Sequence, residues 1–147
     1  MDLSEWGDSP ATRTFLLNLI DTPVTRSQAA CQGALLLIDS TQGIQAQTIS
    51  VYHSAKERGL KIIPILNKID LPAADVDRVT NQLETTFGID PSEILHVSAK
   101  TGFGVDGVLQ EIVRRIPPPP GRISAPLRAL LFDSLFTRPS ASIIIAA

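Results

Sequence analysis

Two short polar segments of this chain carry the residue types needed to recognise a purine base. The first, Asn67-Lys68-Ile69-Asp70, follows one apolar run, and the second, Ser98-Ala99-Lys100, follows a later one. An aspartate carboxylate accepts two hydrogen bonds side by side, and guanine presents two adjacent donors, its N1–H and its 2-amino group. Asp70 can therefore read guanine, because adenine lacks this donor pair. By analogy with bidentate base readout in duplexes, such a pair gives about 1–3 kcal/mol of discrimination.

The neighbouring residues of both segments have complementary roles in such a site. Asn67 can hydrogen-bond the base edge and brace the adjoining loop, and the aliphatic stem of Lys68 can cover the purine ring while its ammonium stays in water. Ser98 and the backbone N–H of Ala99 would meet the O6 side of the base, and Lys100 would cover the other face of the ring. Each segment alone also fits an ordinary polar loop. Their occurrence at the ends of successive strands favours the guanine interpretation.

Other candidate groups fit structural roles better. Asp39 ends an apolar run and is expected to cap a loop rather than to bind a ligand. His53 and His96 have no partner at metal-ligand spacing, so we predict no metal site and no catalytic residue. Lys100-Thr101-Gly102 is not a phosphate loop, because no Gly-x-x-x-x-Gly-Lys frame precedes it. The single cysteine, Cys31, excludes an internal disulfide and is expected to act as a small buried hydrophobe.

Bulk composition limits the classes of function. The chain has 147 residues, of which 44% are hydrophobic, and this is enough for one ordinary domain. A net charge of -2 and a pI near 5.6 provide no basic field for sequence-independent binding to nucleic acid, so no DNA partner is predicted. No window is long and apolar enough to span a membrane. Residues 1–8 fit neither a secretory signal nor a mitochondrial transit peptide, so the chain as written is expected to be cytosolic.

Hydrophobic periodicity places both polar segments at the carboxyl ends of parallel strands. Short apolar runs alternate with amphipathic helical patterns, which is typical of β-α-β units in an α/β fold. The expected strands are residues 15–20, 34–38, 61–66 and 94–97, and the expected helices are residues 45–58, 75–87 and 105–116. Pro64 counts against the third strand, because proline cannot donate to a ladder. Open α/β sheets bind ligands at the carboxyl ends of their strands, where both segments would lie.

A proline-rich segment divides the chain. Residues 117–125 begin with Pro117-Pro118-Pro119-Pro120 and are expected to form a stiff linker. Before it, residues 15–116 form a partial α/β domain, while residues 1–14 remain unassigned. After it, residues 126–147 would start a truncated, β-rich second domain that is too short to bury a core alone.

Longer stretches around these motifs resemble one known family. They are Asp21-Thr22-Pro23 and residues 29–39, 42–48, 67–72 and 98–102. In combination they resemble the translational GTPases of the LepA, or elongation factor 4, family. The amino-acid sequence of residues 45–48 resembles the mitochondrial members more than the bacterial ones. The resemblance to the family covers about residues 15–134.

The resemblance implies a function and a set of site residues. It implies ribosome binding, ribosome-dependent hydrolysis of GTP to GDP and phosphate, and a role in elongation fidelity through back-translocation of tRNAs. It also implies GTP or GDP as ligand, Mg²⁺ in the intact family, a location on the matrix side of mitochondria and peripheral membrane association. The implied guanine-binding residues are Asn67, Lys68, Asp70, Ser98, Ala99 and Lys100, and the implied remnant of the phosphate and magnesium site is Asp21, Thr22 and Pro23.

Two parts of the family pattern are missing from these residues. The family's P-loop, first strand and first switch loop precede the residues that match Phe15, and a Gly-His-Val-Asp-Phe block is absent between Pro23 and Val24. That block carries the glycine that senses the γ-phosphate and the histidine that positions the attacking water. We therefore expect an incomplete P-loop GTPase-like α/β sheet that lacks its first strand and P-loop, followed by a stub of a β-rich second domain. Nucleotide binding is expected to be weak or absent, and GTP hydrolysis not measurable.

Some alternatives stay open at this point. Without the first strand, residues 15–20 and 34–38 either leave two exposed strand edges or pair directly with each other. The function is that of a partial translation GTPase, of a non-catalytic guanine-nucleotide or ribosome-binding module, or of a gene-model fragment with no independent role.

Overall fold

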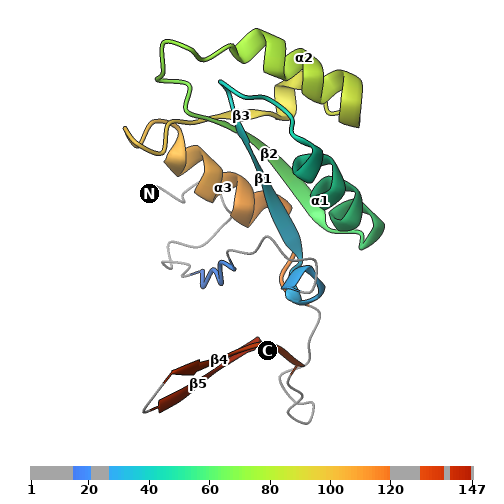
Figure 1. The fold of residues 1–147 in the computed structure, drawn as a ribbon, viewed down its shortest axis with the longest axis vertical. Helices are drawn as coiled ribbons and strands as arrows, with labels where there is room; N and C mark the ends of the chain where they lie inside the picture. The colour runs from blue at the N-terminus through green and yellow to red at the C-terminus, as the bar shows by residue number, and fades with distance from the viewer. Residues whose placement is uncertain (1–14, 21–26, 120–129, 138–139, 147) are drawn as a thin grey trace, which may run out of the picture.

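A three-stranded parallel sheet forms the centre of the main body of the protein (Figure 1). The structure is a computed structural model that describes residues 15–20, 27–119, 130–137 and 140–146. In chain order, the elements of this body are η2 (Ser27–Ala30), β1 (Gly33–Asp39), α1 (Ala46–Glu57), β2 (Lys61–Asn67), α2 (Val76–Phe87), η3 (Pro91–Glu93), β3 (Leu95–His96) and α3 (Val105–Arg115). The strand order is β1-β2-β3, so β2 is the central strand. The predicted α/β class is confirmed.

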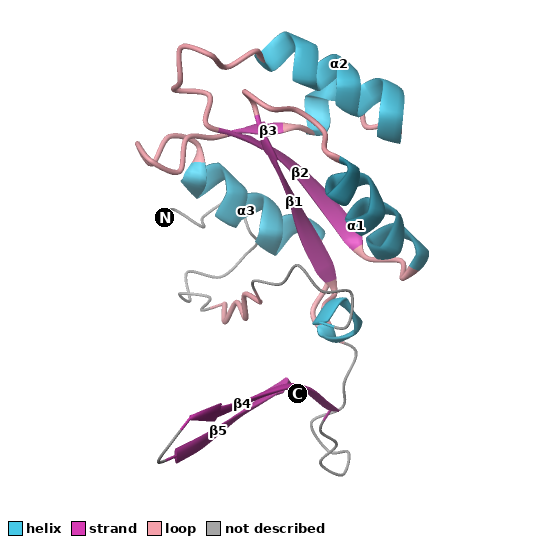
Figure 2. Ribbon diagram, in the orientation of Figure 1, coloured by secondary structure: helices cyan, strands magenta, loops and turns pink. Residues whose placement is uncertain are grey.

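Helices cover both faces of the sheet, as expected for parallel strands (Figure 2). Successive side chains of a strand point to opposite faces, so each strand contributes to two apolar layers. One layer joins the sheet to α1 and α2 and contains Leu36, Ile38, Tyr52, Leu66, Val79, Leu83, Phe87, Ile89 and Ile94. The other joins the sheet to α3 and contains Ile63, Ile65, Val97 and Ile112. These layers hold the carboxyl ends of the strands in fixed positions.

Pro64 lies inside β2 without disrupting the ladder that joins β2 to β1. In a strand, the backbone groups of alternate residues point to the same side. The carbonyl of Leu66 accepts from Val97 on the β3 side at 2.9 Å, so the missing donor of Pro64 also faces β3. Within the described sheet, β3 pairs with β2 at Ile65 and Leu66, beyond Pro64. The proline therefore removes no hydrogen bond between β2 and β1. The strand predicted at residues 61–66 is confirmed as β2.

The strand predicted at residues 15–20 is wrong. These residues have no regular secondary structure, although they form an apolar run. Leu16 and Leu19 are 87% and 72% exposed, so they do not pack against the sheet. A strand requires a ladder partner, and the described sheet consists of β1, β2 and β3, in which β1 pairs with β2 and not with residues 15–20. Direct pairing of the first two predicted strands is thus not the arrangement adopted.

The predicted helices are confirmed with small changes at their ends. Asp75 precedes α2 and its carboxylate accepts from the backbone N–H of Arg78 at 3.1 Å, which satisfies a free donor of the first turn. Gly88 ends the same helix with a φ of 67°, a left-handed conformation that glycine adopts without strain. No helix among the described residues is long and apolar enough to cross a membrane.

Two further strands follow the proline-rich segment. They are β4 (Leu130–Thr137) and β5 (Ser140–Ala146), which pair antiparallel with an irregularity between Leu131 and Asp133. Strand-forming sequence was expected in this region, from residue 126 onward, and residues 126–129 lie outside the described part of the chain. The division into a linker and a second domain stays a prediction.

Candidate functional site

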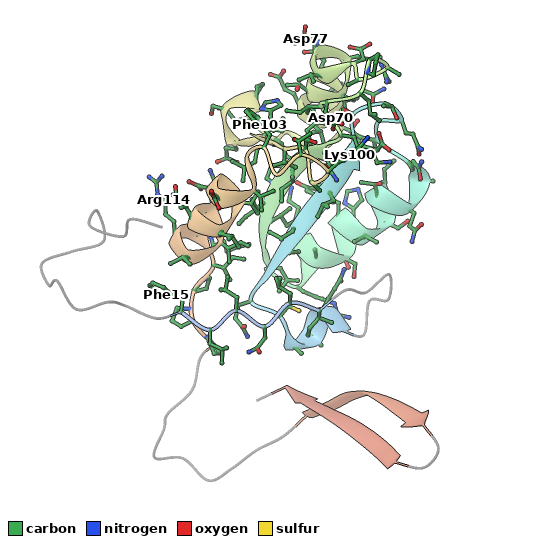
Figure 3. All side chains as sticks on the ribbon, turned by 90° about the vertical axis from the view of Figure 1, so that its left-hand side faces the viewer. Phe15, Asp70, Asp77, Lys100, Phe103 and Arg114 are labelled. Carbon is green, nitrogen blue, oxygen red and sulfur yellow. The ribbon has the colours of Figure 1, made fainter. Side chains whose placement is uncertain are left out.

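The two polar segments lie at one edge of the sheet. Asp39 and Asn67 end neighbouring parallel strands and stand opposite each other in the register. The loops that follow these strands are joined, because the backbone N–H of Ser40 donates to the carbonyl of Asn67 at 3.0 Å. Figure 3 shows Asp70 and Lys100 at this same end of the molecule. Open α/β sheets bind ligands at this edge, so the structure brings the predicted residues to the expected place.

Asn67 is the residue that connects the two segments. Its Oδ1 accepts hydrogen bonds from the backbone N–H of Lys68 at 2.8 Å and from the backbone N–H of Ala99 at 3.1 Å. The loop-bracing role predicted for this side chain is therefore confirmed. The N–H of Ala99, which was expected to face the O6 side of a base, is directed to Asn67 in this structure.

Lys68 has an unusual backbone conformation at the centre of the site. Its φ is 65°, the one positive φ of a non-glycine residue in the described part of the chain. This left-handed region is uncommon for residues with a side chain. It is held by the bond from Lys68 N–H to Asn67 and by a bond from Leu71 N–H to the Lys68 carbonyl at 3.2 Å. The turn directs the lysine side chain back across the edge of the sheet.

The ammonium of Lys68 reaches the carboxylate of Asp39. The Nζ–Oδ2 distance is 2.6 Å, and the two side chains are 51% and 18% exposed. The other carboxylate oxygen, Oδ1, accepts from the backbone N–H of Thr41 at 2.8 Å and from its hydroxyl at 2.7 Å. The bond from Lys68, and after it the bonds from Thr41, lower the pKa of Asp39 from 3.8 to about 2.

The loop-cap role expected of Asp39 is confirmed by these Thr41 bonds. Its pairing with Lys68 was missed by the sequence interpretation. The sequence did contain a signal for this ion pair. Asp39 ends β1 and Asn67 ends β2, and neighbouring parallel strands bring the residues at their carboxyl ends together.

Asp70 and Lys100 are the exposed charged groups of the two segments. Asp70 follows the turn at Lys68, and Lys100 lies in the loop after β3. Within the described part of the chain, neither side chain has a hydrogen-bond or ion-pair partner. An exposed carboxylate with no protein partner keeps all of its acceptor capacity for a ligand. Asp70 is thus suited to accept the donor pair of a guanine.

Ser98 has a different position from the one expected. It is completely buried, and its Oγ accepts from the backbone N–H of Thr101 at 3.2 Å. Its backbone N–H donates to Phe103 at 3.0 Å, and its carbonyl accepts from Gly102 at 2.9 Å. These bonds close the loop that presents Ala99 and Lys100. The expected contact of the serine hydroxyl with a base is therefore replaced by a loop-forming role, because the side chain points inward.

The phosphate side of the predicted site lies outside the described residues. It consists of Asp21, Thr22 and Pro23, which belong to the segment 21–26. Among the residues that are described, no group of three or more histidine, cysteine, aspartate or glutamate side chains could hold a metal ion. Cys31 is half-buried, and burial raises the pKa of its thiol.

The fold and the strand-end motifs define a class of protein, the α/β domains of P-loop GTPase type. A crystal structure of a variant of Era from Aquifex aeolicus, bound to GDP and AlF4⁻, matches with a TM-score of 0.55 and 21% sequence identity. The match covers 82% of this chain and 36% of that chain. At this identity the likeness shows the fold alone.

Sequence comparison specifies the family. The family model of the elongation factor Tu GTP binding domain matches residues 4–118. The mitochondrial translation factor GUF1 of Laccaria bicolor is 66% identical over 134 residues, covering 86% of this chain and 21% of that protein. Elongation factor 4 of Chlorobium phaeobacteroides is 54% identical over 130 residues, covering 83% of this chain and 22% of that protein. The chain belongs to the elongation factor Tu GTP-binding-domain family, and within it to the translational GTPases of the elongation factor 4, or LepA, group.

This membership confirms the resemblance found in the motifs. The chain spans about a fifth of the length of these two relatives. The part of this chain that matches the GTP binding domain model is residues 4–118.

Proposed function

We propose that this chain carries the base-recognising half of the guanine-nucleotide site of a translation-elongation GTPase. The observation that carries the proposal is the exposed carboxylate of Asp70, which has no partner among the described residues and lies beside two loops that Asn67 holds together. Asp70 accepts the N1–H and 2-amino donors of guanine, and adenine offers no such pair. Because bonds within the protein, from Lys68 and Ala99 to Asn67, already hold both loops together, binding would require little further ordering.

Lysine side chains cover the two faces of the base in this proposal. The stem of Lys68 starts beside Asn67 and is half-exposed, so one side of it is available to a purine ring. Lys100 is exposed on the loop that Ser98 closes. Ser98 contributes by shaping this loop, and the backbone of Ala99 contributes through its bond to Asn67. Asp21, Thr22 and Pro23 would belong to the phosphate and magnesium side of the site.

The wider role proposed is that of the family. It comprises ribosome-dependent GTP hydrolysis in protein synthesis, back-translocation and elongation fidelity, in mitochondria. The mitochondrial location is supported by the names of relatives such as the GUF1 proteins of Laccaria bicolor and Phaeodactylum tricornutum, which are 66% and 55% identical to this chain. The division into a nucleotide domain (15–116), a linker (117–125) and the start of a second domain (126–147) belongs to the same proposal.

We further propose that the 147-residue polypeptide by itself does not hydrolyse GTP measurably. Its sequence contains no Gly-x-x-x-x-Gly-Lys segment, the loop that binds the phosphates in such enzymes. Three or four charge-assisted bonds at about 1.5–3 kcal/mol each amount to roughly 5–12 kcal/mol. Without them the affinity falls by several powers of ten, about one for each 1.4 kcal/mol.

Titration with fluorescently labelled GDP, against equally labelled ADP, tests base recognition. We expect a preference for GDP that Asp70→Ala removes. The matched control is Asp77→Ala, because Asp77 is also an exposed aspartate but lies in the first turn of α2 (Figure 3). A wild-type chain that binds GDP and ADP equally would refute the proposal.

Phosphate release from GTP, measured with and without ribosomes, tests the proposal that the chain by itself does not hydrolyse GTP. We expect no release above background from the 147-residue chain. Turnover that is lost in Asp70→Ala would show that the chain is a working GTPase.

A further inference from the structure

The ion pair between Asp39 and Lys68 crosses the edge of the sheet on which the proposed base site lies. Asp39 ends β1 and Lys68 follows β2, and the register places Asp39 opposite Asn67. The lysine Nζ lies 2.6 Å from the Oδ2 of Asp39. The lysine stem therefore spans from the end of one strand to the end of its neighbour.

Both ends of this lysine are held. Its backbone has a φ of 65° and donates to Asn67 Oδ1 at 2.8 Å, which fixes where the side chain starts. Its ammonium is bound by Asp39, which fixes where the side chain ends. A lysine stem has several rotatable bonds, and such a side chain loses considerable rotamer freedom when it is ordered. Here the contacts that order the side chain come from the protein itself, from Asn67 and Asp39.

The two carboxylate oxygens of Asp39 contact different residues. Oδ1 accepts both bonds from Thr41, at 2.8 Å from the backbone N–H and 2.7 Å from the hydroxyl. Oδ2 is left for Lys68. Because Thr41 fixes the orientation of the carboxylate, the carboxylate in turn fixes the ammonium. The aspartate is 18% exposed and the lysine 51%, so the carboxylate is shielded while much of the lysine faces solvent.

We propose that Asp39 is a positioning residue of the guanine site, which acts through Lys68 by holding the lysine stem in place as a preformed platform for the purine ring. The inference rests on the proposed function, since it assigns a new member to the same site. A preordered platform raises affinity by removing an ordering cost from the binding step. For a partly exposed ion pair, we expect about a two- to fivefold effect on affinity.

A double-mutant cycle with Asp39→Asn and Lys68→Met tests this positioning role. Asparagine keeps an oxygen for the Thr41 bonds but lacks the charge, and methionine keeps an apolar stem but cannot form the ion pair. We expect Asp39→Asn to weaken binding of labelled GDP about two- to fivefold in the wild-type background. In the Lys68→Met background the same change should have no further effect. The matched control Asp77→Asn removes one exposed carboxylate from α2 and should leave GDP affinity unchanged.

A second readout follows the lysine itself in the absence of nucleotide. The rate of reductive methylation of Lys68, measured by mass spectrometry, should rise in Asp39→Asn as the ammonium is released. Lys61 is the internal control, because it is exposed at the opposite end of β2. A general loosening of the fold by Asp39→Asn would raise methylation at Lys61 as well as at Lys68.

The outcomes separate the inference from the proposed function. Equal binding of GDP and ADP by the wild-type chain overturns both. A wild-type preference for GDP, combined with wild-type GDP affinity in Asp39→Asn, overturns the inference alone. Equal effects of Asp39→Asn in both backgrounds also overturn it, because the aspartate would then act without Lys68.

Discussion

The Oδ1 of Asn67 accepts a hydrogen bond from the backbone N–H of Ala99 at 3.1 Å, and this bond ties the loop after β2 to the loop after β3. The same oxygen accepts from Lys68 N–H at 2.8 Å. One side-chain amide thus determines both the conformation of its own turn and the position of the neighbouring loop. Two segments that are separate in the sequence are joined through this side chain.

Replacing Asn67 by alanine should lower both stability and GDP affinity. The change leaves the N–H groups of Lys68 and Ala99 without their acceptor, and each lost bond costs about 0.5–1.5 kcal/mol. We expect a fall of about 1–3 kcal/mol in the free energy of unfolding, measured in urea. Asn81→Ala, on the exposed surface of α2, is the control and should change stability by no more than about 0.5 kcal/mol. Equal effects of the two changes would contradict the bridging role of Asn67.

Replacing Asp70 by asparagine should shift the base preference from guanine to xanthine. Asparagine presents one acceptor and one donor side by side, whereas the carboxylate presents two acceptors. Guanine then loses one of its two bonds, and xanthine, which has a carbonyl in place of the 2-amino group, gains a matching partner. Titration with labelled GDP and labelled xanthosine diphosphate should show weaker binding of the first and stronger binding of the second. Because Asp70 is exposed and has no described protein partner, the free energy of unfolding should not change.

Gly104 should tolerate alanine much less well than Gly102. Both have a positive φ, 75° and 82°, which costs a residue with a side chain about 1–2 kcal/mol. A Cβ on Gly104 would also collide with the backbone oxygen of His96, whereas a Cβ on Gly102 meets open space. Overpacking adds about 1–3 kcal/mol. We therefore expect Gly104→Ala to cost about 2–5 kcal/mol and Gly102→Ala about 1–2 kcal/mol in urea unfolding.

A third glycine variant serves as control for this comparison. Gly107 lies within α3, and a Cβ there meets no atom within 4 Å. Gly107→Ala should raise the free energy of unfolding by about 0.5–1 kcal/mol, because alanine favours helix. If Gly104→Ala were no worse than Gly102→Ala, the close approach of the loop to His96 would be disproved.

The contribution of Asp39 to stability should depend on pH in the acidic range. Its pKa is lowered from 3.8 to about 2 in the folded chain, so the folded state favours the charged carboxylate. A lowered pKa adds stability that is fully present above the unfolded pKa and is lost as the pH falls through the folded value. The difference in unfolding free energy between the wild type and Asp39→Asn should be constant above about pH 5 and shrink between about pH 4 and pH 2. Urea unfolding at a series of pH values measures this, and a difference that grows on acidification would show the opposite shift.

Local patterns in the sequence were sufficient for most of the elements and for the position of the two polar segments at the strand ends. The structure confirms the apolar runs of β1 and β2 and the amphipathic pattern of α2, with Asp75 before it and Gly88 after it. The two polar segments lie at the carboxyl ends of β2 and β3, as predicted. These features are local, since they depend on residues near each other in the chain. Family membership followed from the same residues.

What the sequence could not decide depends on partners that are distant along the chain. Residues 15–20 are as apolar as a strand, but a strand exists only with a ladder partner, and these residues have none. Pro64 is acceptable only because β3 meets β2 beyond it. The side chain of Ser98 points inward, where its hydroxyl oxygen accepts a hydrogen bond from the backbone N–H of Thr101 in the same loop.

The sequence by itself therefore determined the α/β class, the family and the residue types that we propose to recognise guanine. The tertiary structure alone decided how those residues are joined, through Asn67 to Ala99 and Asp39 to Lys68. The reason is that neighbouring parallel strands bring their carboxyl ends together, whatever the separation of those ends along the chain.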